Sequence, residues 1–468
     1  MNYLEELLVT SNRSKNMYAY LKKTYGKDQI VVKNIEHKII GSLFRQNVLS
    51  IHWVKNSLLI QTKDKIIIYD PKKGKISIFK NISLIIEKIV YSYKTWKFII
   101  EVINNDESIH IFLVNLEDNN ISKLICLRNK DKISLYCNMD KPLKKIVKNY
   151  IYKRTEQNKY QRIDSCFDKN YSYIVENGTI YKLNGFIDRY VYMQDDIVLS
   201  IGNFITPTQI MLFSDFLEFR KDIKKDGFSH KWINGIPVYD NELIAEETIV
   251  FLHGGPNSSF LPLFDYLIYY LSNIKKRRII LLNYPGSTGY SKAYQTSLYG
   301  NGGRIDLDSI MSVILSLKIN TEACIVIGES YGGYLATMLA FTSELTFNKC
   351  VSINGFTDLF FQYIFSPARQ VILKYFDISD RAHVKNVNPI ELAKHKKITQ
   401  ELIFLHSTND KICPIGQIQE LLKTYKETFS DVHCNQLSLE KIDDISHEQF
   451  DINERIKLTS KLITVLEK

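Results

Sequence analysis

The segment Gly-Glu-Ser-Tyr-Gly-Gly-Tyr, residues 328–334, places a serine between two glycines in the pattern G-x-S-x-G. This pattern is typical of a sharp turn between a strand and a helix, from which the serine hydroxyl projects as a nucleophile. The apolar run at residues 323–327 precedes the serine, and the helix-like segment YLATMLAFTSEL follows it. Glycines flank the serine because the tight turn leaves no room for side chains. Ser330 is therefore the candidate nucleophile.

A serine hydroxyl becomes a good nucleophile only when a base removes its proton, so a histidine and an acid that orients it must also be present. In α/β-hydrolases these residues come in the order Ser, acid, His, each in a loop after a later strand. Asp410 follows the apolar segment ELIFLH, and His447 follows NQLSLEK. Ser330, Asp410 and His447 are thus the predicted triad.

Other acids and histidines fit this order less well. Some come before the last predicted strand, one lies within a strand, and two are too close in sequence to His447 to occupy the loop of the preceding strand. These competitors are Asp431, His433, His406, Asp443 and Asp444. Asp410 and His447 are preferred over them because each follows its own strand.

Attack on a carbonyl group builds negative charge on its oxygen, which needs fixed N–H donors. The sequence His253-Gly254-Gly255-Pro256 ends an apolar strand and matches the glycine-rich loop that supplies one donor. The amide of Tyr331, directly after the nucleophile, would supply the second. Gly254 or Gly255, together with Tyr331, is therefore the predicted oxyanion hole.

The hydrophobic pattern predicts the elements that carry these residues. Near-continuous apolar segments alternate with helix-length segments, which is typical of a mainly parallel, doubly wound sheet with helices on both faces. The apolar segments are 248–253, 278–283, 323–328, 349–353, 401–406 and 435–440. Residues 216–468 are therefore predicted to form an α/β-hydrolase catalytic domain.

The N-terminal half has a different pattern. Within residues 31–215, short apolar segments such as 57–61, 65–69, 97–102 and 109–114 are separated by turn residues. Strand pairs recur about every 40 residues, the length of a propeller blade. This region is predicted to be all-β and propeller-like, with room for about four blades. Residues 1–30 carry leucines at helical spacing and are predicted to form a helical segment.

Composition limits the partners and the compartment. The net charge of +10 comes with Lys spread along the whole chain and with no nucleic-acid motif, so solvated surface charge is favoured over nucleic-acid binding. The 7 cysteines form no C-x-x-C pair, which argues against a zinc site or a disulfide framework. Neither a signal-peptide pattern nor a membrane-spanning stretch is present. The expected location is cytoplasmic.

Several motifs in one order resemble the prolyl oligopeptidase family of serine peptidases, in particular its acylaminoacyl-peptidase-like branch. They are HGGP at 253–256, NYPGSTGYS at 283–291, GESYGGY at 328–334, NPI at 388–390, HSTNDKICP at 406–414 and SHEQF at 446–450. The resemblance implies an α/β-hydrolase domain behind a β-propeller. It also implies cleavage of short peptides by Ser330, Asp410 and His447, with no metal or organic cofactor.

The chain departs from the pattern of this family in three ways. Pro285 stands where the family usually has an arginine, and Ser446 and Glu448 stand where glycines commonly flank the histidine. The N-terminal region is also far shorter than a seven-bladed propeller. The first two differences leave the chemistry intact and bear on substrate preference, whereas the third bears on the exclusion of large substrates.

The predicted function is hydrolysis of short peptides through an acyl-enzyme. The same triad fits an esterase or a peptide-tailoring acyl transferase or cyclase, because only the nucleophile that removes the acyl group differs. A third alternative is a non-catalytic scaffold whose β domain binds a partner. Phe356 and Phe360 are candidate walls of a substrate pocket, although aromatic residues at this spacing are more often core. A homo-oligomer is compatible with the sequence, which leaves the oligomeric state open.

Overall fold

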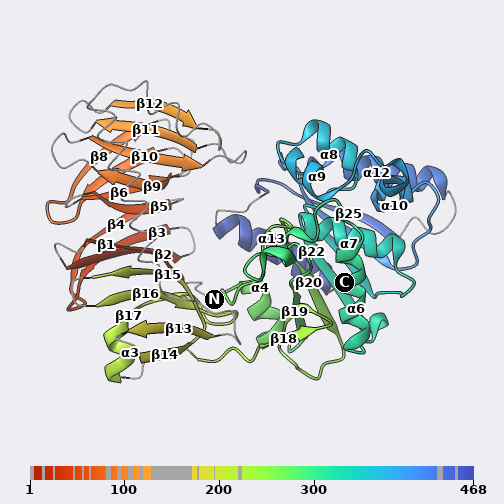
Figure 1. Cartoon of the computed structure of the whole chain (residues 1–468), viewed down its shortest axis with the longest axis horizontal. Coiled ribbons are helices and arrows are strands. Elements are labelled where there is room, and N and C mark those ends of the chain that lie inside the picture. Colours follow the sequence, from red (N-terminus) through yellow and green to blue (C-terminus); the bar gives the residue numbers. More distant parts are fainter. Residues whose placement is uncertain are drawn as a thin grey trace. The chain divides into compact units, whose positions relative to one another are not determined.

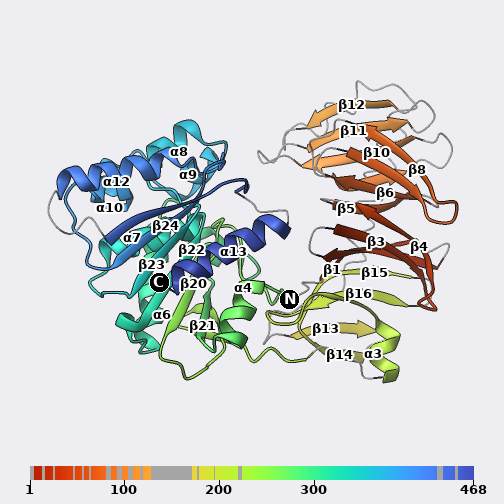
Figure 2. The same ribbon diagram turned by 180° about the vertical axis from the view of Figure 1, so that it is seen from behind.

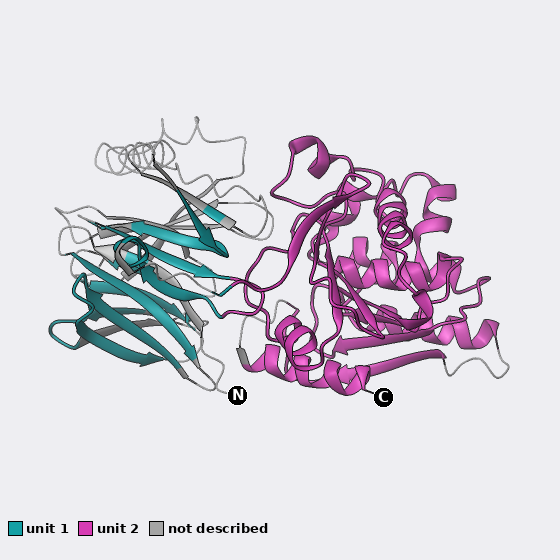
Figure 3. Ribbon diagram, turned by 90° about the horizontal axis from the view of Figure 1, so that it is seen from below, with its two compact units in different colours: residues 1–166, 171–202, 207–224 teal, residues 167–170, 203–206, 225–468 magenta. Residues whose placement is uncertain are grey.

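The structure is a computed structural model of the chain. It describes residues 5–467 except 13–15, 25–26, 46–47, 55–56, 63–64, 81–85, 92–96, 104–108, 116–119, 128–170, 177–178, 194–195, 220–223, 430–435 and 448–451. The described residues form two compact units, which Figure 3 shows in different colours. The second unit comprises residues 203–206 and everything described from Lys225 onward, and the first comprises the rest. The predicted boundary at residue 215 instead falls inside helix α3 (Phe213–Phe219).

Antiparallel sheets of consecutive strands make up the first unit (Figure 1). Three of them have four strands each, joined in chain order: β1–β4, β5–β8 and β9–β12. Their strands are β1 Glu5–Asn12, β2 Met17–Thr24, β3 Lys27–Asn34, β4 Ile39–Arg45, β5 Val48–Val54, β6 Ser57–Thr62, β7 Lys65–Asp70, β8 Lys75–Lys80, β9 Ile86–Tyr91, β10 Lys97–Ile103, β11 Ile109–Asn115 and β12 Asn120–Leu127. A hairpin and a three-stranded sheet follow, formed by β13 Tyr171–Glu176 with β14 Thr179–Asn184 and by β15 Phe186–Tyr192, β16 Ile197–Gly202 and β17 Gln209–Leu212.

Neighbouring sheets of the first unit pack through their first strands. Strand β1 contacts β5, and β5 contacts β9. Strand β1 also contacts β15, β16 and β17, so the sheet that begins the unit lies beside the sheet that ends it. Such adjacency of first and last sheets is typical of propeller blades. The prediction of an all-β, propeller-like region is confirmed, while the number of blades stays a prediction because residues 128–170 lie outside the described part.

The prediction of a helix over residues 1–30 is wrong. Strands β1 and β2 pair antiparallel, and β2 pairs with β3. In β2, Ala19 and Leu21 enter one hydrophobic cluster while Tyr18 and Tyr20 enter another. A strand buried on both faces has a continuous run of apolar residues, and such a run does not show the alternation that would distinguish it from a helix.

The second unit is built on an eight-stranded sheet with the order β18-β19-β21-β20-β22-β23-β24-β25. Its strands are β18 Ser229–Ile233, β19 Ile236–Asp240, β20 Thr248–Leu252, β21 Arg278–Leu282, β22 Cys324–Glu329, β23 Lys349–Ile353, β24 Glu401–Ser407 and β25 Leu437–Ile442. Strands β20–β25 are parallel, and β18 and β19 form an antiparallel hairpin at one edge. The predicted α/β class is confirmed. The edge hairpin was missed, because only its turn at Asn234-Gly235 gave a signal.

Helices cover both faces of this sheet (Figures 1 and 2). Val250 and Leu252 of β20 face one hydrophobic core, which includes residues of helices α6 (Ile305–Ser316), α7 (Tyr331–Thr342) and α12 (Gly416–Thr428). Ile249 and Phe251 face a second core with α4 (Tyr266–Tyr269) and α13 (Ile452–Leu466). This alternation explains why every residue of β20 is buried. Within the described part of the chain, no helix has the length and apolar character needed to cross a membrane.

Candidate active site

Ser330 occupies the turn between β22 and α7 in an unusual conformation. Its φ of 55° and ψ of −114° lie outside the regions that non-glycine residues commonly adopt. The N–H of Ser330 donates to the carbonyl of Ile353 at 2.8 Å, and the carbonyl of Ser330 accepts from the N–H of Tyr334 at 3.0 Å. Bonds to a neighbouring strand and to the first turn of α7 therefore hold the backbone in this conformation.

The two glycines of the motif allow main chains to approach closely at this turn. A Cβ atom on Gly328 would lie 1.9 Å from the carbonyl oxygen of Gly332. A Cβ atom on Gly332 would lie 2.1 Å from the carbonyl oxygen of Leu252, at the end of β20. Both distances are far below van der Waals contact, so the turn requires glycine at both positions.

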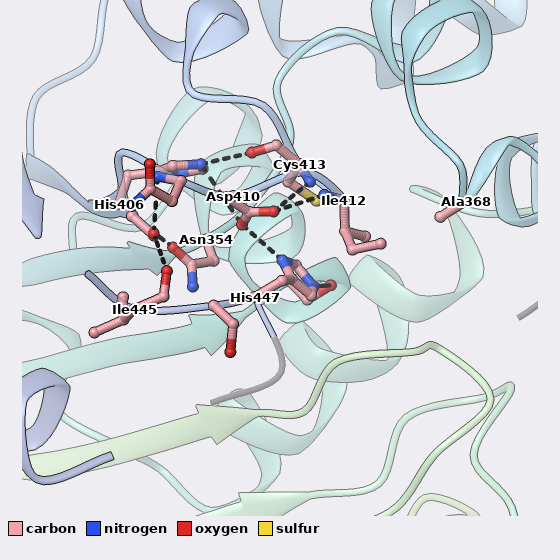
Figure 4. A network of polar contacts seen from close by, with 12 residues as sticks. Asn354, Ala368, His406, Asp410, Ile412, Cys413, Ile445 and His447 are labelled. Carbon is pink, nitrogen blue, oxygen red and sulfur yellow. Dashed lines mark hydrogen bonds and ion pairs between the residues drawn. The ribbon is translucent and has the colours of Figure 1, made fainter. Parts of the chain in front are cut away.

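The three residues predicted as a triad form one row of hydrogen bonds. His447 Nε2 lies 3.0 Å from Ser330 Oγ, and His447 Nδ1 lies 2.6 Å from Asp410 Oδ2. Figure 4 shows the imidazole of His447 beside the carboxylate of Asp410. An ionised carboxylate only accepts, so Nδ1 carries the proton and the neutral ring presents the lone pair of Nε2 to the serine hydroxyl. The structure brings the three side chains together, while their catalytic roles stay a prediction.

The loop of Asp410 is held from three directions. Asp410 Oδ1 accepts the N–H groups of Ile412 at 2.8 Å and Cys413 at 2.7 Å (Figure 4), which leaves Oδ2 for His447. The carbonyl of Ile412 accepts from Gln362 Nε2 at 2.7 Å, in the middle of α8 (Leu359–Phe365), and from Ser366 Oγ at 2.6 Å, at the C-cap of that helix. His406 lies buried behind the loop and donates from Nε2 to the carbonyl of Cys413. Burial lowers the pKa of His406, which keeps its ring neutral.

The loop of His447 is tied to helix α13. Glu454, in the first turn of that helix, accepts hydrogen bonds from both the N–H and the hydroxyl of Ser446. The hydroxyl of Ser407 also donates to the carbonyl of Ile445 at 2.6 Å. Ser446 is one of the departures from the family pattern, and the structure gives its hydroxyl a partner. The other departure beside the histidine, Glu448, lies outside the described residues.

We expect Glu454→Ala to lower kcat by about tenfold and to change KM much less, because it frees the histidine loop without touching the substrate. Glu454→Gln can still accept from the N–H of Ser446, so it should retain most of the rate. Steady-state kinetics of both variants on one peptide measure this difference. Equal rates for the alanine variant and the unmodified protein would contradict the positioning role.

Among the competing residues, His406 supports the loop of Asp410, and Asp443 and Asp444 have partners outside the triad. Asp443 accepts a hydrogen bond from the hydroxyl of Thr408 at 2.8 Å, and Asp444 lies 3.8 Å from Lys457 Nζ. Asp431 and His433 are outside the described residues. Among the residues that the structure describes, no group of three or more His, Cys, Asp or Glu side chains could hold a metal ion.

Of the predicted oxyanion residues, Gly254 lies directly against the nucleophile. A Cβ atom on Gly254 would lie 3.2 Å from Ser330 Cβ and 3.8 Å from its Oγ. Gly255 has a φ of 116°, and a Cβ atom there would lie 2.6 Å from the nitrogen of Asn257. Glycine at 254 thus opens space beside the serine, and glycine at 255 allows the turn. Tyr331 is the first residue of α7, where backbone N–H groups lack partners within the helix.

A buried histidine and a buried tyrosine support this glycine loop, and the sequence motifs predict a role for neither side chain. His253 Nδ1 donates to the carbonyl of Gly254 at 2.7 Å, and its Nε2 lies 2.7 Å from Ser287 Oγ. The ring of Tyr284 stacks on His253 with centroids 4.3 Å apart, and its hydroxyl donates to the carbonyl of His253 at 2.6 Å. Burial lowers the pKa of His253 to about 4, so the ring is neutral at neutral pH. In the sequence, only the family motif NYPGSTGYS pointed to Tyr284 and Ser287.

The two aromatic residues predicted to line a substrate pocket have different surroundings. Phe356 is 3% exposed and packs in the core, stacked on Tyr334 with ring centroids 4.7 Å apart. It has almost no surface to offer a substrate, which corrects the prediction for this residue. Phe360 is 43% exposed on α8, so its role as a pocket wall stays a prediction.

Comparison with known proteins finds a family match within the second unit. Residues 269–437 match the model of the prolyl oligopeptidase family. Acylamino-acid-releasing enzyme 1 of Oryza sativa subsp. japonica is 25% identical over 197 residues, which cover 38% of this chain and 25% of that enzyme. Acylamino-acid-releasing enzyme of Arabidopsis thaliana is 27% identical over 207 residues, which cover 39% and 26%. The match thus spans about a quarter of each relative.

Solved structures show the same fold over nearly the whole chain. An acylaminoacyl peptidase of Pyrococcus horikoshii superposes with a TM-score of 0.68 at 14% identity, covering 99% of this chain and 96% of that one. An acylaminoacyl peptidase in complex with Z-Gly-Gly-Phe-chloromethyl ketone superposes with a TM-score of 0.65 at 15% identity, covering 100% and 96%. The family match, the curated relatives and the fold agree with the resemblance seen in the motifs, and residues 269–437 carry a prolyl oligopeptidase family domain.

Proposed function

We propose that this protein hydrolyses short peptides through an acyl-enzyme on Ser330. The row of hydrogen bonds from Ser330 Oγ through His447 to Asp410 Oδ2 is the observation that carries the proposal. As Oγ attacks the carbonyl carbon, His447 Nε2 takes the hydroxyl proton, and the carboxylate of Asp410 stabilises the imidazolium that results. Because Asp410 is 5% exposed, its interaction with the imidazolium is weakly screened by water.

The tetrahedral intermediate carries its negative charge on the former carbonyl oxygen. The amides of Gly254 and Tyr331 are the proposed donors to this oxygen, in keeping with the position of Gly254 beside Ser330. Collapse of the intermediate breaks the C–N bond, and the leaving amine takes the proton from His447. A water molecule then attacks the acyl-enzyme with His447 again as base, which releases the acid and restores the serine.

A short peptide with a blocked amino terminus is the first substrate to test. The curated relatives carry the name acylamino-acid-releasing enzyme. One structural neighbour was solved in complex with Z-Gly-Gly-Phe-chloromethyl ketone. These names concern other proteins, and the chain aligns with about a quarter of the curated ones, so the substrate class is part of the proposal.

Labelling with a fluorophosphonate, followed by mass spectrometry of the products from a blocked peptide, tests this function. We expect the probe on Ser330 and two hydrolysis fragments from the peptide. Ser330→Ala should lose the label and reduce kcat by a factor of about 1,000 or more. Turnover that survives in the Ser330→Ala variant would refute the assignment. Transfer of the acyl group to an added amine, with no hydrolysis, would instead support the acyl-transferase alternative.

A further inference from the structure

A buried carboxylate outside the triad is linked to the proposed oxyanion hole. Asp306, at the second residue of α6, is 0% exposed. Its Oδ2 accepts the hydroxyl of Tyr331 at 2.8 Å and the N–H of Gly303 at 3.2 Å, and its Oδ1 accepts the N–H of Leu307 at 2.9 Å. All three partners are donors, so the site suits an ionised carboxylate.

The partner of Asp306 is the residue that supplies one proposed oxyanion donor. The ring of Tyr331 is fully buried among aromatic side chains, with centroid distances of 5.5 Å to Tyr334 and 6.0 Å to Phe376. A Cβ atom on Gly302 would lie 2.8 Å from the Tyr331 hydroxyl, so main chain also closes around the phenol. Because Tyr331 directly follows Ser330, an anchored side chain restrains the direction of its backbone N–H.

The second proposed donor is connected to the same group of residues. Tyr284 stacks on His253 at 4.3 Å and on Tyr331 at 6.1 Å, with interplanar angles of 16° and 26°. His253 in turn donates to the carbonyl of Gly254. Asp306, Tyr331, Tyr284 and His253 thus form a buried column that reaches both backbone segments of the oxyanion hole.

We propose that Asp306 is a positioning residue for the oxyanion hole, which holds the phenol of Tyr331 and thereby aims the Tyr331 amide at the developing negative charge. This inference rests on the proposed function, because it assigns a role in the same transition state. Burial raises the pKa of Asp306 to about 6, so the fold keeps a charge that is unfavourable at this depth. A buried carboxylate that is kept in contact with three hydrogen-bond donors is consistent with a functional role for Asp306.

Two variants remove the hydrogen bond between Asp306 and Tyr331, one by changing the acceptor and the other by removing the donor. Asp306→Asn keeps the shape but turns an NH2 group toward backbone or hydroxyl donors, and Tyr331→Phe removes the hydroxyl. We measure kcat and KM on an acyl ester and on the matching thionoester, whose sulfur accepts hydrogen bonds poorly and fits an oxyanion hole badly. Each variant should lower kcat for the ester by about 10- to 100-fold with little change in KM. The ratio of the ester rate to the thionoester rate should also fall. A loss of folded enzyme would lower both rates equally and leave this ratio unchanged.

A double variant and a matched control complete the experiment. Because Asp306 acts through the phenol, Asp306→Asn with Tyr331→Phe should be about as slow as the slower single variant. Tyr334→Phe removes another buried phenol from the same cluster, one that donates to the carbonyl of Val387 at 2.7 Å, and should leave the rate ratio at the unmodified value. If Asp306→Asn does not fold, Tyr331→Phe alone still tests the inference.

The outcomes separate the inference from the function on which it rests. An unmodified protein that turns over neither ester and takes no fluorophosphonate label on Ser330 overturns both. An active unmodified protein whose Asp306→Asn and Tyr331→Phe variants keep both kcat and the rate ratio overturns the inference alone. An equal fall of the ratio in Tyr334→Phe also overturns it, because the effect would then belong to the whole aromatic cluster.

Discussion

Asp410→Asn is expected to lower kcat for peptide hydrolysis by about four orders of magnitude while leaving the fold in place. The carboxylate has two different tasks, since Oδ1 accepts two backbone N–H groups and Oδ2 accepts Nδ1–H of His447. In asparagine the oxygen stays with the two N–H groups, and the NH2 group faces the imidazole. The imidazole then carries its proton on Nε2 instead of Nδ1, so an N–H group points at Ser330. A ring in that tautomer cannot accept the hydroxyl proton.

Kinetics over a range of pH on a blocked peptide measure this loss, and circular dichroism verifies the fold. Asp443→Asn is the matched control, because Asp443 follows the next strand and its carboxylate accepts from the hydroxyl of Thr408. We expect this control to remain within about threefold of the unmodified rate. The reverse ranking, with Asp443→Asn inactive and Asp410→Asn active, would move the acid to the loop that precedes His447.

The proximity of the three proposed triad residues could be predicted from sequence because each member follows a buried parallel strand. Apolar strands are visible as continuous runs, and their carboxyl ends meet along one edge of the sheet. The order of Ser330, Asp410 and His447 along the chain therefore translated directly into proximity. The G-x-S-x-G spacing added local information, because the close approaches at Gly328 and Gly332 need glycine whatever the rest of the fold does.

Supporting contacts could not be predicted in the same way. Tyr331 and Asp306 are 25 positions apart, and Gln362 and Ile412 are 50 apart. Each pair meets only because helices pack on the sheet. The sequence of either segment does not predict which residue of the other it contacts. The buried polar residues also look like surface residues in sequence, as Asp306 does in RIDLDS. Sequence reasoning is therefore strongest for residues at strand ends and weakest for polar groups inside the helical layers.

Errors in the fold prediction have a related cause. Leucines at helical spacing predict a helix over residues 1–30, whereas residues 17–21 are all buried in a strand whose apolar run carries no alternation to reveal it. Phe356 was assigned to a pocket because aromatic residues cluster in sequence around it, although its ring packs against Tyr334 in the core. In both cases a one-dimensional pattern was consistent with two environments, and only packing between distant segments decided between them.

Gly332→Ala should destabilise the second unit by about 3–5 kcal/mol, which is at the severe end for a single methyl group. The new Cβ would meet the carbonyl oxygens of Leu252 at 2.1 Å and His253 at 2.7 Å. Both contacts are with main chain, so no side chain can rotate away, and α7 must move from the end of β20. That movement would also separate Ser330 from Gly254, so the folded fraction should lose activity.

Urea unfolding followed by tryptophan fluorescence measures the change in stability, and fluorophosphonate labelling rates report the site. Gly416→Ala is the matched control, because its Cβ would meet only Phe361 Cζ at 4.0 Å and the residue begins helix α12. In a helix, alanine replaces glycine with a gain of about 0.5–1 kcal/mol, so this control should be neutral or more stable. A Gly332→Ala protein with the unfolding midpoint of the unmodified chain would mean that β20 and α7 do not approach at this glycine. The position of Gly254 against the nucleophile, and with it the proposed oxyanion hole, would then lose its structural basis.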